Sequence, residues 1–169
     1  MTPGLPQWIV LALAGQRLIE IAYAKRNTAR LLADGGREVG ARHYPLFVLL
    51  HAMWLIALFF AVPNDTDIVW LLIGVFAALQ LGRLWVIVSL GRYWTTRIIT
   101  VAGAPLVRRG PYKFLRHPNY AIVTCELAVL PLAFGAWWIA AAFTILNAAL
   151  LAHRIRIENA ALAARRGEA

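Results

Sequence analysis

The sequence contains a single cysteine, Cys125, and only 15% of its 169 residues are charged. One cysteine excludes an intrachain disulfide and a zinc site built on two thiolates. An ordinary soluble domain has about 25% charged residues, so this chain has too few of them for a soluble surface. Hydrophobic residues make up 61% of the chain instead. This composition excludes a disordered chain, a collagen-like chain and a disulfide scaffold, and it indicates a protein surrounded by lipid.

Five apolar runs contain most of the hydrophobic residues. They cover about 5–24, 44–62, 68–90, 120–137 and 138–152. Most approach the roughly 20 residues that a helix needs to cross a bilayer. The last two share one apolar block, which we interpret as a helical hairpin with a tight turn at 134–137. The sequence therefore predicts an all-α integral membrane protein of about five transmembrane helices, folded as a single domain over residues 1–169.

The basic residues lie on one side of this predicted topology. All 17 lysines and arginines fall in or after the first run, between late in the third run and the start of the fourth, or after the fifth run. The positive-inside rule then predicts an N-terminus outside and a C-terminus in the cytoplasm. The net charge of +9 needs no nucleic acid under this topology, and anionic membrane lipid is the expected electrostatic partner.

Several ionisable side chains fall inside the predicted spans, where they are costly and usually mark a site. Four lie in the cytoplasmic half of the membrane when depth is counted at about 1.5 Å per residue: Glu20, His51, Arg83 and Glu126. Arg17 and Glu20 are spaced to pair on one helix face, and Asn147 is a further candidate for this layer. The layer is either a polar clasp that holds the helices in register or a functional site. Glu126 is the stronger site candidate, since no basic residue lies near it in its own helix.

The long polar connection, residues 91–118, contains two local signals. The β-rich run 94–101, followed by a turn and by residues 106–107, predicts a small β-hairpin on the membrane surface. Pro118 disfavours helix at His117 and suits the first position of the next helix. The N-terminus of that helix would attract a carboxylate or a phosphate. A basic, aromatic interfacial loop is the other interpretation of the same residues.

The C-terminal segment carries Arg154 and Glu158, four residues apart. These side chains share a face if the fifth run continues as a helix. The alternative is an ordinary surface ion pair, which contributes little to stability.

Together these motifs resemble the isoprenylcysteine carboxyl methyltransferase family, whose members are integral-membrane methyltransferases that use S-adenosylmethionine. The resemblance rests on Gly110-Pro111-Tyr112, Arg116-His117-Pro118-Asn119-Tyr120 and the Arg154…Glu158 pair. Segments at 16–20, 24–27, 40–45 and 89–94 resemble a bacterial branch that accompanies type III polyketide synthases and O-methylates alkylresorcinols or alkylpyrones. The chain departs from the prenylcysteine enzymes at Ile122, where they usually have glycine, and at Asn159, where they usually have a second glutamate.

The resemblance implies roles for particular residues. The implied cofactor-binding residues are Tyr112, His117, Pro118, Tyr120, Arg154 and Glu158. On the acceptor side, Glu126 or His51 would act as a base or an orienting acceptor, and Arg83 would stabilise an oxyanion or anchor a carboxylate. The acceptor would be a lipid-like small molecule that enters from the bilayer of a bacterial inner membrane. It would be methylated at the hydroxyl of an alkylphenol or alkylpyrone, or alternatively at the carboxyl of an isoprenylcysteine. No metal is expected, because the histidines have no ligand spacing.

Functions of other classes would also place polar residues inside a membrane. A small transporter would line a path with them, and a non-catalytic assembly subunit would use them as contacts. The ionisable residues of this chain cluster in the cytoplasmic half of the spans, whereas a path would also need polar residues in the outer half. Saturable binding of S-adenosylmethionine separates the methyltransferase from both alternatives.

Overall fold

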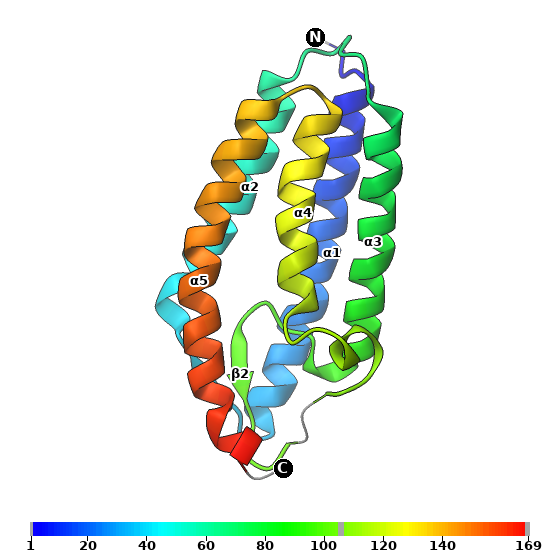
Figure 1. Ribbon diagram of the computed structural model, residues 1–169. Helices are drawn as coiled ribbons and strands as arrows, with labels where there is room; N and C mark the ends of the chain where they lie inside the picture. The colour runs from blue at the N-terminus through cyan, green and yellow to red at the C-terminus, as the bar shows by residue number, and fades with distance from the viewer. Residues whose placement is uncertain (1, 105–106, 168–169) are drawn as a thin grey trace.

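Five long helices stand side by side in the described part of the chain, residues 2–104 and 107–167 of the computed structural model, with side chains described up to residue 161 (Figure 1). They are α1 (Leu5–Ala33), α2 (Tyr44–Ala61), α3 (Trp70–Leu90), α4 (Pro118–Ala133) and α5 (Trp137–Gly167). The closest neighbours are α3 with α4 and α4 with α5, so α4 lies between the other two. The predicted helical class and the predicted hairpin of the last two helices are confirmed for these residues.

The predicted apolar runs are parts of these helices rather than their full extent. α1 continues to Ala33 rather than ending near 24, and α5 covers Trp137–Gly167 rather than 138–152. Hydropathy marks where side chains become polar, whereas the backbone helix continues through good helix formers such as Ala, Leu, Lys and Arg. α4 is shorter than the predicted 120–137. A tight turn follows it at Gly135, whose φ of +70° favours glycine.

Within the described residues, three helical segments are long and apolar enough to cross a membrane, namely Ala41–Ala61, Trp70–Tyr93 and Trp137–Ala161. α4 is apolar but shorter than these segments. α1 is less hydrophobic, because its central part contains Gln16, Arg17 and Glu20. The number of five spans therefore stays a prediction, while the bundle itself consists of five helices in the described residues.

Strand β2 (Ile98–Thr100) confirms the β-rich run, but its partner is not the one predicted. It pairs antiparallel with β1 (Arg37–Val39), and Arg37 lies opposite Thr100. The Nη1 atom of Arg97 also lies 2.9 Å from Oε2 of Glu38 beside this pair. The predicted second arm at 106–107 is wrong as the partner of this strand, and Leu106 itself lies outside the described residues. Local β propensity identifies a strand, but it does not select a partner that lies some 60 residues away in the sequence.

The two ends of the bundle differ in character. The N-terminus and the short connections at 62–69 and 134–136 lie at one end, at the top of Figure 1. The connections at 34–43 and 91–117 and the end of α5 lie toward the other end, and they carry most of the basic residues. Fully buried apolar side chains, among them Leu58, Leu130 and Ile139, fill the core nearer the first end.

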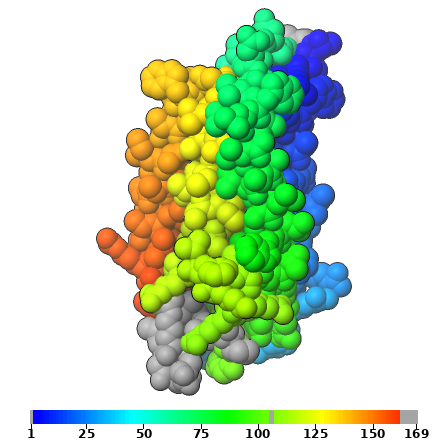
Figure 2. All heavy atoms as spheres, turned by 45° about the vertical axis from the view of Figure 1, so that its right-hand side comes forward, coloured from blue at the N-terminus to red at the C-terminus, as the bar shows by residue number. Residues whose placement is uncertain are grey.

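The sides of the bundle are apolar. Figure 2 shows α3, in green, along one face with α4 beside it. Leu71, Leu81 and Val88 of α3 are 77%, 69% and 66% exposed. Leu18 and Ile19 of α1, Phe60 of α2 and Ile145 of α5 are also mostly exposed. An apolar surface on every side of a bundle is what contact with lipid tails requires, and a soluble monomer rarely exposes so much.

Candidate functional site

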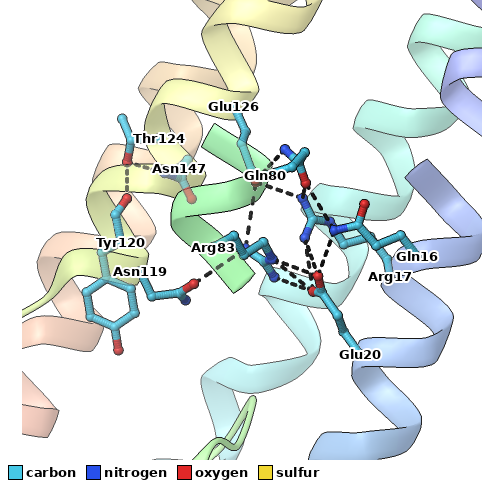
Figure 3. A network of polar contacts seen from close by, with 10 residues as sticks. All are labelled: Gln16, Arg17, Glu20, Gln80, Arg83, Asn119, Tyr120, Thr124, Glu126 and Asn147. Carbon is cyan, nitrogen blue, oxygen red and sulfur yellow. Dashed lines mark hydrogen bonds and ion pairs between the residues drawn. The ribbon is translucent and has the colours of Figure 1, made fainter. Parts of the chain in front are cut away.

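An ionic network joins α1, α3 and α4 (Figure 3). Glu20 is its centre: Oε2 of Glu20 lies 2.7 Å from Nη2 of Arg83 and 2.9 Å from Nη1 of Arg17. The Nη2 atom of Arg17 lies 2.8 Å from Oε2 of Glu126, and Nη1 of Arg83 lies 3.7 Å from the same oxygen. Two arginines and two glutamates of opposite charge thus lie within contact of one another.

Two glutamines complete this network. Gln80 Nε2 donates a hydrogen bond to Glu126 Oε1 over 2.8 Å, and Gln16 Nε2 donates to Glu20 Oε1 over 3.0 Å. Glu126, Arg83 and Glu20 are 3%, 8% and 9% exposed. Buried charges are tolerated when they are paired and their remaining lone pairs accept hydrogen bonds, and both carboxylates meet that condition.

The sequence-based layer is therefore found for Glu20, Arg83 and Glu126, and the expected pair of Arg17 and Glu20 is present. The two glutamines were missed. Their signal is weak, because a neutral amide inside a span is much less conspicuous than a charge. Its only trace is spacing, since Gln16 precedes Glu20 by four residues and Gln80 precedes Arg83 by three.

His51 bonds within its own helix rather than to the network. Its Nδ1 atom lies 2.7 Å from the carbonyl oxygen of Phe47, one turn earlier in α2. A carbonyl oxygen only accepts, so Nδ1 carries the proton and Nε2 keeps a lone pair. His51 is thereby held as the tautomer whose Nε2 can accept a proton.

Asn147 does not join the network either. It is fully buried in α5, and its Nδ2 donates to Thr124 Oγ1 over 3.1 Å. Thr124 lies on a different face of α4 from Glu126 (Figure 3). Asn147 therefore lies close to the depth of Glu126 but has no described contact with the ionic network, because depth along a helix does not determine the direction in which a side chain points.

A second group of polar side chains lies where α4 begins and α5 leaves the apolar region. We name it the tyrosine cluster, and it consists of His117, Tyr120, Arg154 and Glu158. The hydroxyl of Tyr120 donates to Glu158 Oε2 over 2.5 Å, and Arg154 Nε donates to the Tyr120 hydroxyl over 2.8 Å. The His117 ring stacks on the Tyr120 ring at 5.2 Å between centroids and 12° between planes. The structure thus brings together four side chains that the sequence placed in two distant motifs.

The start of α4 positions the first half of this cluster. Pro118 occupies the first helical position with His117 immediately before it, as the sequence predicts. The preceding connection is held on α3, where Arg109 Nε donates to the carbonyl oxygen of Ser89 over 2.8 Å. Gly110 allows the close approach, since it has φ of +58° and a Cβ there would lie 2.1 Å from Ser89 Oγ.

Contacts from α2 and from the segment just before β2 orient Arg154. Its Nη2 atom donates to the carbonyl oxygen of Thr96 over 2.9 Å, and its guanidinium lies 5.1 Å from the centroid of the Phe47 ring. The Nδ1 atom of His117 lies 3.6 Å from Oε2 of Glu158. The cluster therefore presents a cation, a carboxylate and stacked aromatic rings at one place.

Two further features bear on ligand binding at the tyrosine cluster. The Nε2 atom of His117 is buried and has no hydrogen-bond partner among the described residues, and such atoms usually find one. Tyr112 packs against the apolar cluster of Ala24, Val86 and Trp94. Burial, with the nearby charge of Glu158, raises the pKa of Tyr112 above its ordinary value, so this phenol stays protonated.

The residues described by the structure include no group of three His, Cys, Asp or Glu side chains that could hold a metal ion.

Comparisons with known proteins give one family. The model of the isoprenylcysteine carboxyl methyltransferase family matches residues 70–164, which include the whole tyrosine cluster. The uncharacterized protein YpbQ of Bacillus subtilis is 39% identical over 160 residues, which cover 92% of this chain and 95% of YpbQ. An uncharacterized protein of Haemophilus influenzae is 28% identical over 153 residues, 86% of this chain and 88% of that protein. No solved structure shows significant similarity.

Proposed function

Because this chain belongs to the isoprenylcysteine carboxyl methyltransferase family and is an integral membrane protein, we propose that it is an S-adenosylmethionine-dependent O-methyltransferase of a lipid-like acceptor. Family membership implies a membrane methyltransferase, and methyltransferases of this family typically use S-adenosylmethionine. We further propose a hydroxyl acceptor of the alkylphenol or alkylpyrone kind, on the resemblance to the branch that accompanies type III polyketide synthases.

The tyrosine cluster is the observation that carries this proposal. S-adenosylmethionine has an ammonium, a carboxylate, a ribose diol, an adenine and a sulfonium, and the cluster offers groups that complement them. Glu158 would bind the ammonium or the ribose, and Arg154 with His117 would bind the carboxylate. The buried, unpartnered Nε2 of His117 supports this fit, because a ligand atom there would satisfy it. Tyr120 would lie beside the adenine or the sulfonium.

S-adenosylmethionine, when bound, supplies a methyl group that the acceptor oxygen takes with a new C–O bond, while the S–C electron pair stays on sulfur and the hydroxyl proton passes to a base. The chain must therefore orient the acceptor and receive that proton. His51 suits the second task, since its tautomer leaves Nε2 as a proton acceptor. Phe47 links His51 to the tyrosine cluster. Its carbonyl oxygen accepts a hydrogen bond from His51, and its ring contacts the guanidinium of Arg154.

The sequence predicts that Glu126 and Arg83 lie on the acceptor side, and we propose a different role for them. Their contacts favour a structural role. Glu126 already accepts hydrogen bonds from Arg17 and Gln80, and Arg83 already donates to Glu20. An orienting base or an oxyanion donor needs atoms that are available to the acceptor. We therefore propose that the ionic network holds α1, α3 and α4 in register.

We propose a membrane orientation of the bundle that suits this function. The tyrosine cluster lies toward the end that carries the basic connections, which the positive-inside rule places in the cytoplasm. We propose that the N-terminus lies outside a bacterial inner membrane and that the acceptor reaches the cluster sideways from the lipid.

Carboxyl methylation of an isoprenylcysteine-type acceptor is the second candidate function. The matched family model itself favours it, since the family is named for that reaction. A carboxylate needs no base, so His51 would be dispensable in that case.

One experiment separates these functions. The purified protein in lipid nanodiscs is incubated with S-adenosylmethionine carrying a labelled methyl group and with pentadecylresorcinol, an alkylpyrone or N-acetyl-S-farnesylcysteine, and the product masses are measured. We expect one added methyl group on the resorcinol or the pyrone. Methylation of the farnesylcysteine alone would establish the second candidate, and the absence of any methylated product would contradict both.

A further inference from the structure

Helix α4 carries polar side chains on two different faces, and the two faces differ in how completely they are paired (Figure 3). One face, with Glu126 and Asn119, meets α3 and α1, and every polar atom of the ionic network that is buried there has a partner among the described contacts. The other face, with Tyr120 and Thr124, meets α5. The second face ends in a polar atom that has no partner.

The hydrogen bonds determine which atom of Asn147 is left over. Thr124 Oγ1 donates its only proton to the carbonyl oxygen of Tyr120 over 2.9 Å. It can then only accept from Asn147, so the amide nitrogen of Asn147 must face Thr124 at 3.1 Å. The amide oxygen Oδ1 consequently points elsewhere, and it is buried without a partner. Asn147 is 0% exposed, so its amide oxygen is a hydrogen-bond acceptor that solvent does not reach.

A second unpartnered atom lies close by on the same helix. Thr144 Oγ1 is buried without a partner, and Thr144 precedes Asn147 by three residues, about one turn. Buried polar atoms in native proteins are nearly always hydrogen-bonded. Two such atoms within about one turn of the same helix are candidates for contact with a polar ligand group.

These atoms are continuous with the tyrosine cluster. Asn147, Arg154 and Glu158 follow one another at seven and four residues, which places them on one face of α5. Asn147 lies about 10 Å deeper than Arg154 along the helix axis. Thr124 lies one turn beyond Tyr120 on α4, and it bonds to both Tyr120 and Asn147.

We propose that Asn147 Oδ1 and Thr144 Oγ1 bind the hydroxyl-bearing head of the methyl acceptor, between α4 and α5 on the membrane side of the tyrosine cluster. This proposal rests on the proposed function and names its acceptor class. While it is bound, a phenol or enol donates a hydrogen bond from its hydroxyl group to Asn147 Oδ1, and the proton passes to His51 when the methyl group is transferred. A carboxylate has only lone pairs to offer, so the same oxygen repels it. The Asn147 oxygen therefore favours neutral hydroxyl acceptors over isoprenylcysteine-type carboxylates, whereas the Thr144 hydroxyl can bond to either class.

The test compares acceptor binding and turnover in wild type and in Asn147→Leu, both in nanodiscs. Direct binding of pentadecylresorcinol to the protein without S-adenosylmethionine is measured first, and the KM for the same acceptor second. We expect the substitution to weaken binding and to raise KM by about tenfold or more, the scale of one lost hydrogen bond to a buried group. The affinity for S-adenosylmethionine should stay within twofold. Ile145→Ala, a truncation on the lipid-exposed side of α5, is the matched control and should change neither value.

A second variant keeps the proposal testable if Asn147→Leu does not fold. Thr124→Val preserves the shape of the side chain but removes the hydroxyl that orients the Asn147 amide, so KM for the resorcinol should again rise several-fold. Thr124→Ser retains that hydroxyl and should behave as wild type.

Three outcomes would overturn the inference. If Thr124→Val and Asn147→Leu both leave the KM and the binding of pentadecylresorcinol within twofold, the acceptor does not contact this site. If wild type prefers N-acetyl-S-farnesylcysteine, the selectivity is wrong while the methyltransferase itself stands. If wild type binds no S-adenosylmethionine, the proposed function fails and the acceptor site fails with it.

Discussion

The hydroxyl of Tyr120 donates a hydrogen bond to Glu158 over 2.5 Å, and this contact joins the first turn of α4 to the part of α5 beyond the apolar region. The same hydroxyl accepts from Arg154 over 2.8 Å. A single phenol thus holds a carboxylate and a guanidinium in fixed positions, and the proposed cofactor site depends on it.

Replacement of Tyr120 by phenylalanine removes both bonds and keeps the ring that stacks on His117. Arg154 and Glu158 then lose their common partner, so we expect the Kd for S-adenosylmethionine to rise about tenfold, the scale of one or two hydrogen bonds to charged groups. Isothermal titration in nanodiscs measures it. Tyr23→Phe, on an exposed position of α1, is the control, and equal Kd values for the two variants would contradict the assigned role.

Replacement of Arg83 by methionine should destabilise the protein strongly. It leaves the Glu20 carboxylate with one fewer cation in a buried place, and breaking such a pair costs about 3–5 kcal/mol. The midpoint of chemical unfolding in mild detergent measures the loss. Arg92→Gln is the matched control, because Arg92 pairs with Asp34 at an exposed position and such pairs contribute about 0–1 kcal/mol. Similar losses for the two variants would show that the ionic network is not the main tie between α1 and α3.

Replacement of His51 by glutamine should lower kcat for a hydroxyl acceptor by about 10²-fold or more, the scale of general-base catalysis, with little effect on the Kd for S-adenosylmethionine.

Replacement of Glu126 by glutamine should keep the hydrogen bond to Gln80 and remove the negative charge that pairs with Arg17. We therefore expect that variant to unfold more easily and to retain kcat within a few fold. The opposite pattern, with kcat lost in Glu126→Gln and kept in His51→Gln, would identify Glu126 as the base.

The membrane orientation predicts a labelling pattern. In a Cys125→Ala background, single cysteines replace the exposed residues Asp65, Lys113 and Ala160. An impermeant maleimide added to intact cells should label position 65 and should leave 113 and 160 unlabelled until the membrane is opened. Labelling of 65 and 113 from the same side would contradict the proposed orientation and the single crossing by α3 between these two positions.

The sequence predicted the positions of elements better than the partners they select. The β-branched run at 98–100 forms a strand, yet its pairing with Arg37–Val39 depends on how α1 and α3 end, which no local pattern contains. Depth counting brought Glu20, Arg83 and Glu126 to one level, because antiparallel helices have regular rise. The same counting could not show that Asn147 contacts Thr124 rather than the ionic network, since depth carries no information on helix face.

The four residues of the tyrosine cluster were predictable because each lies in one of the two sequence motifs. The Arg154…Glu158 spacing implies a common helix face, and Pro118 fixes the start of the helix that presents His117 and Tyr120. Their mutual bonds were not predictable, because they require α5 to continue as a helix beyond the apolar run. The unpartnered oxygens of Asn147 and Thr144 have no sequence signature, since a missing hydrogen bond is a property of the packed structure.

The most direct test of the account is a titration of S-adenosylmethionine into the purified protein in nanodiscs, alongside Glu158→Gln. The variant keeps the shape of the side chain and removes the charge that would bind the ammonium or orient the ribose. We predict saturable binding at one site per chain for wild type and a loss of affinity of at least tenfold for Glu158→Gln. The two proteins should elute alike in size-exclusion chromatography, which checks that the variant is folded. An equal Kd for the two proteins, or no saturable binding by wild type, would contradict the assignment of the tyrosine cluster as the cofactor site.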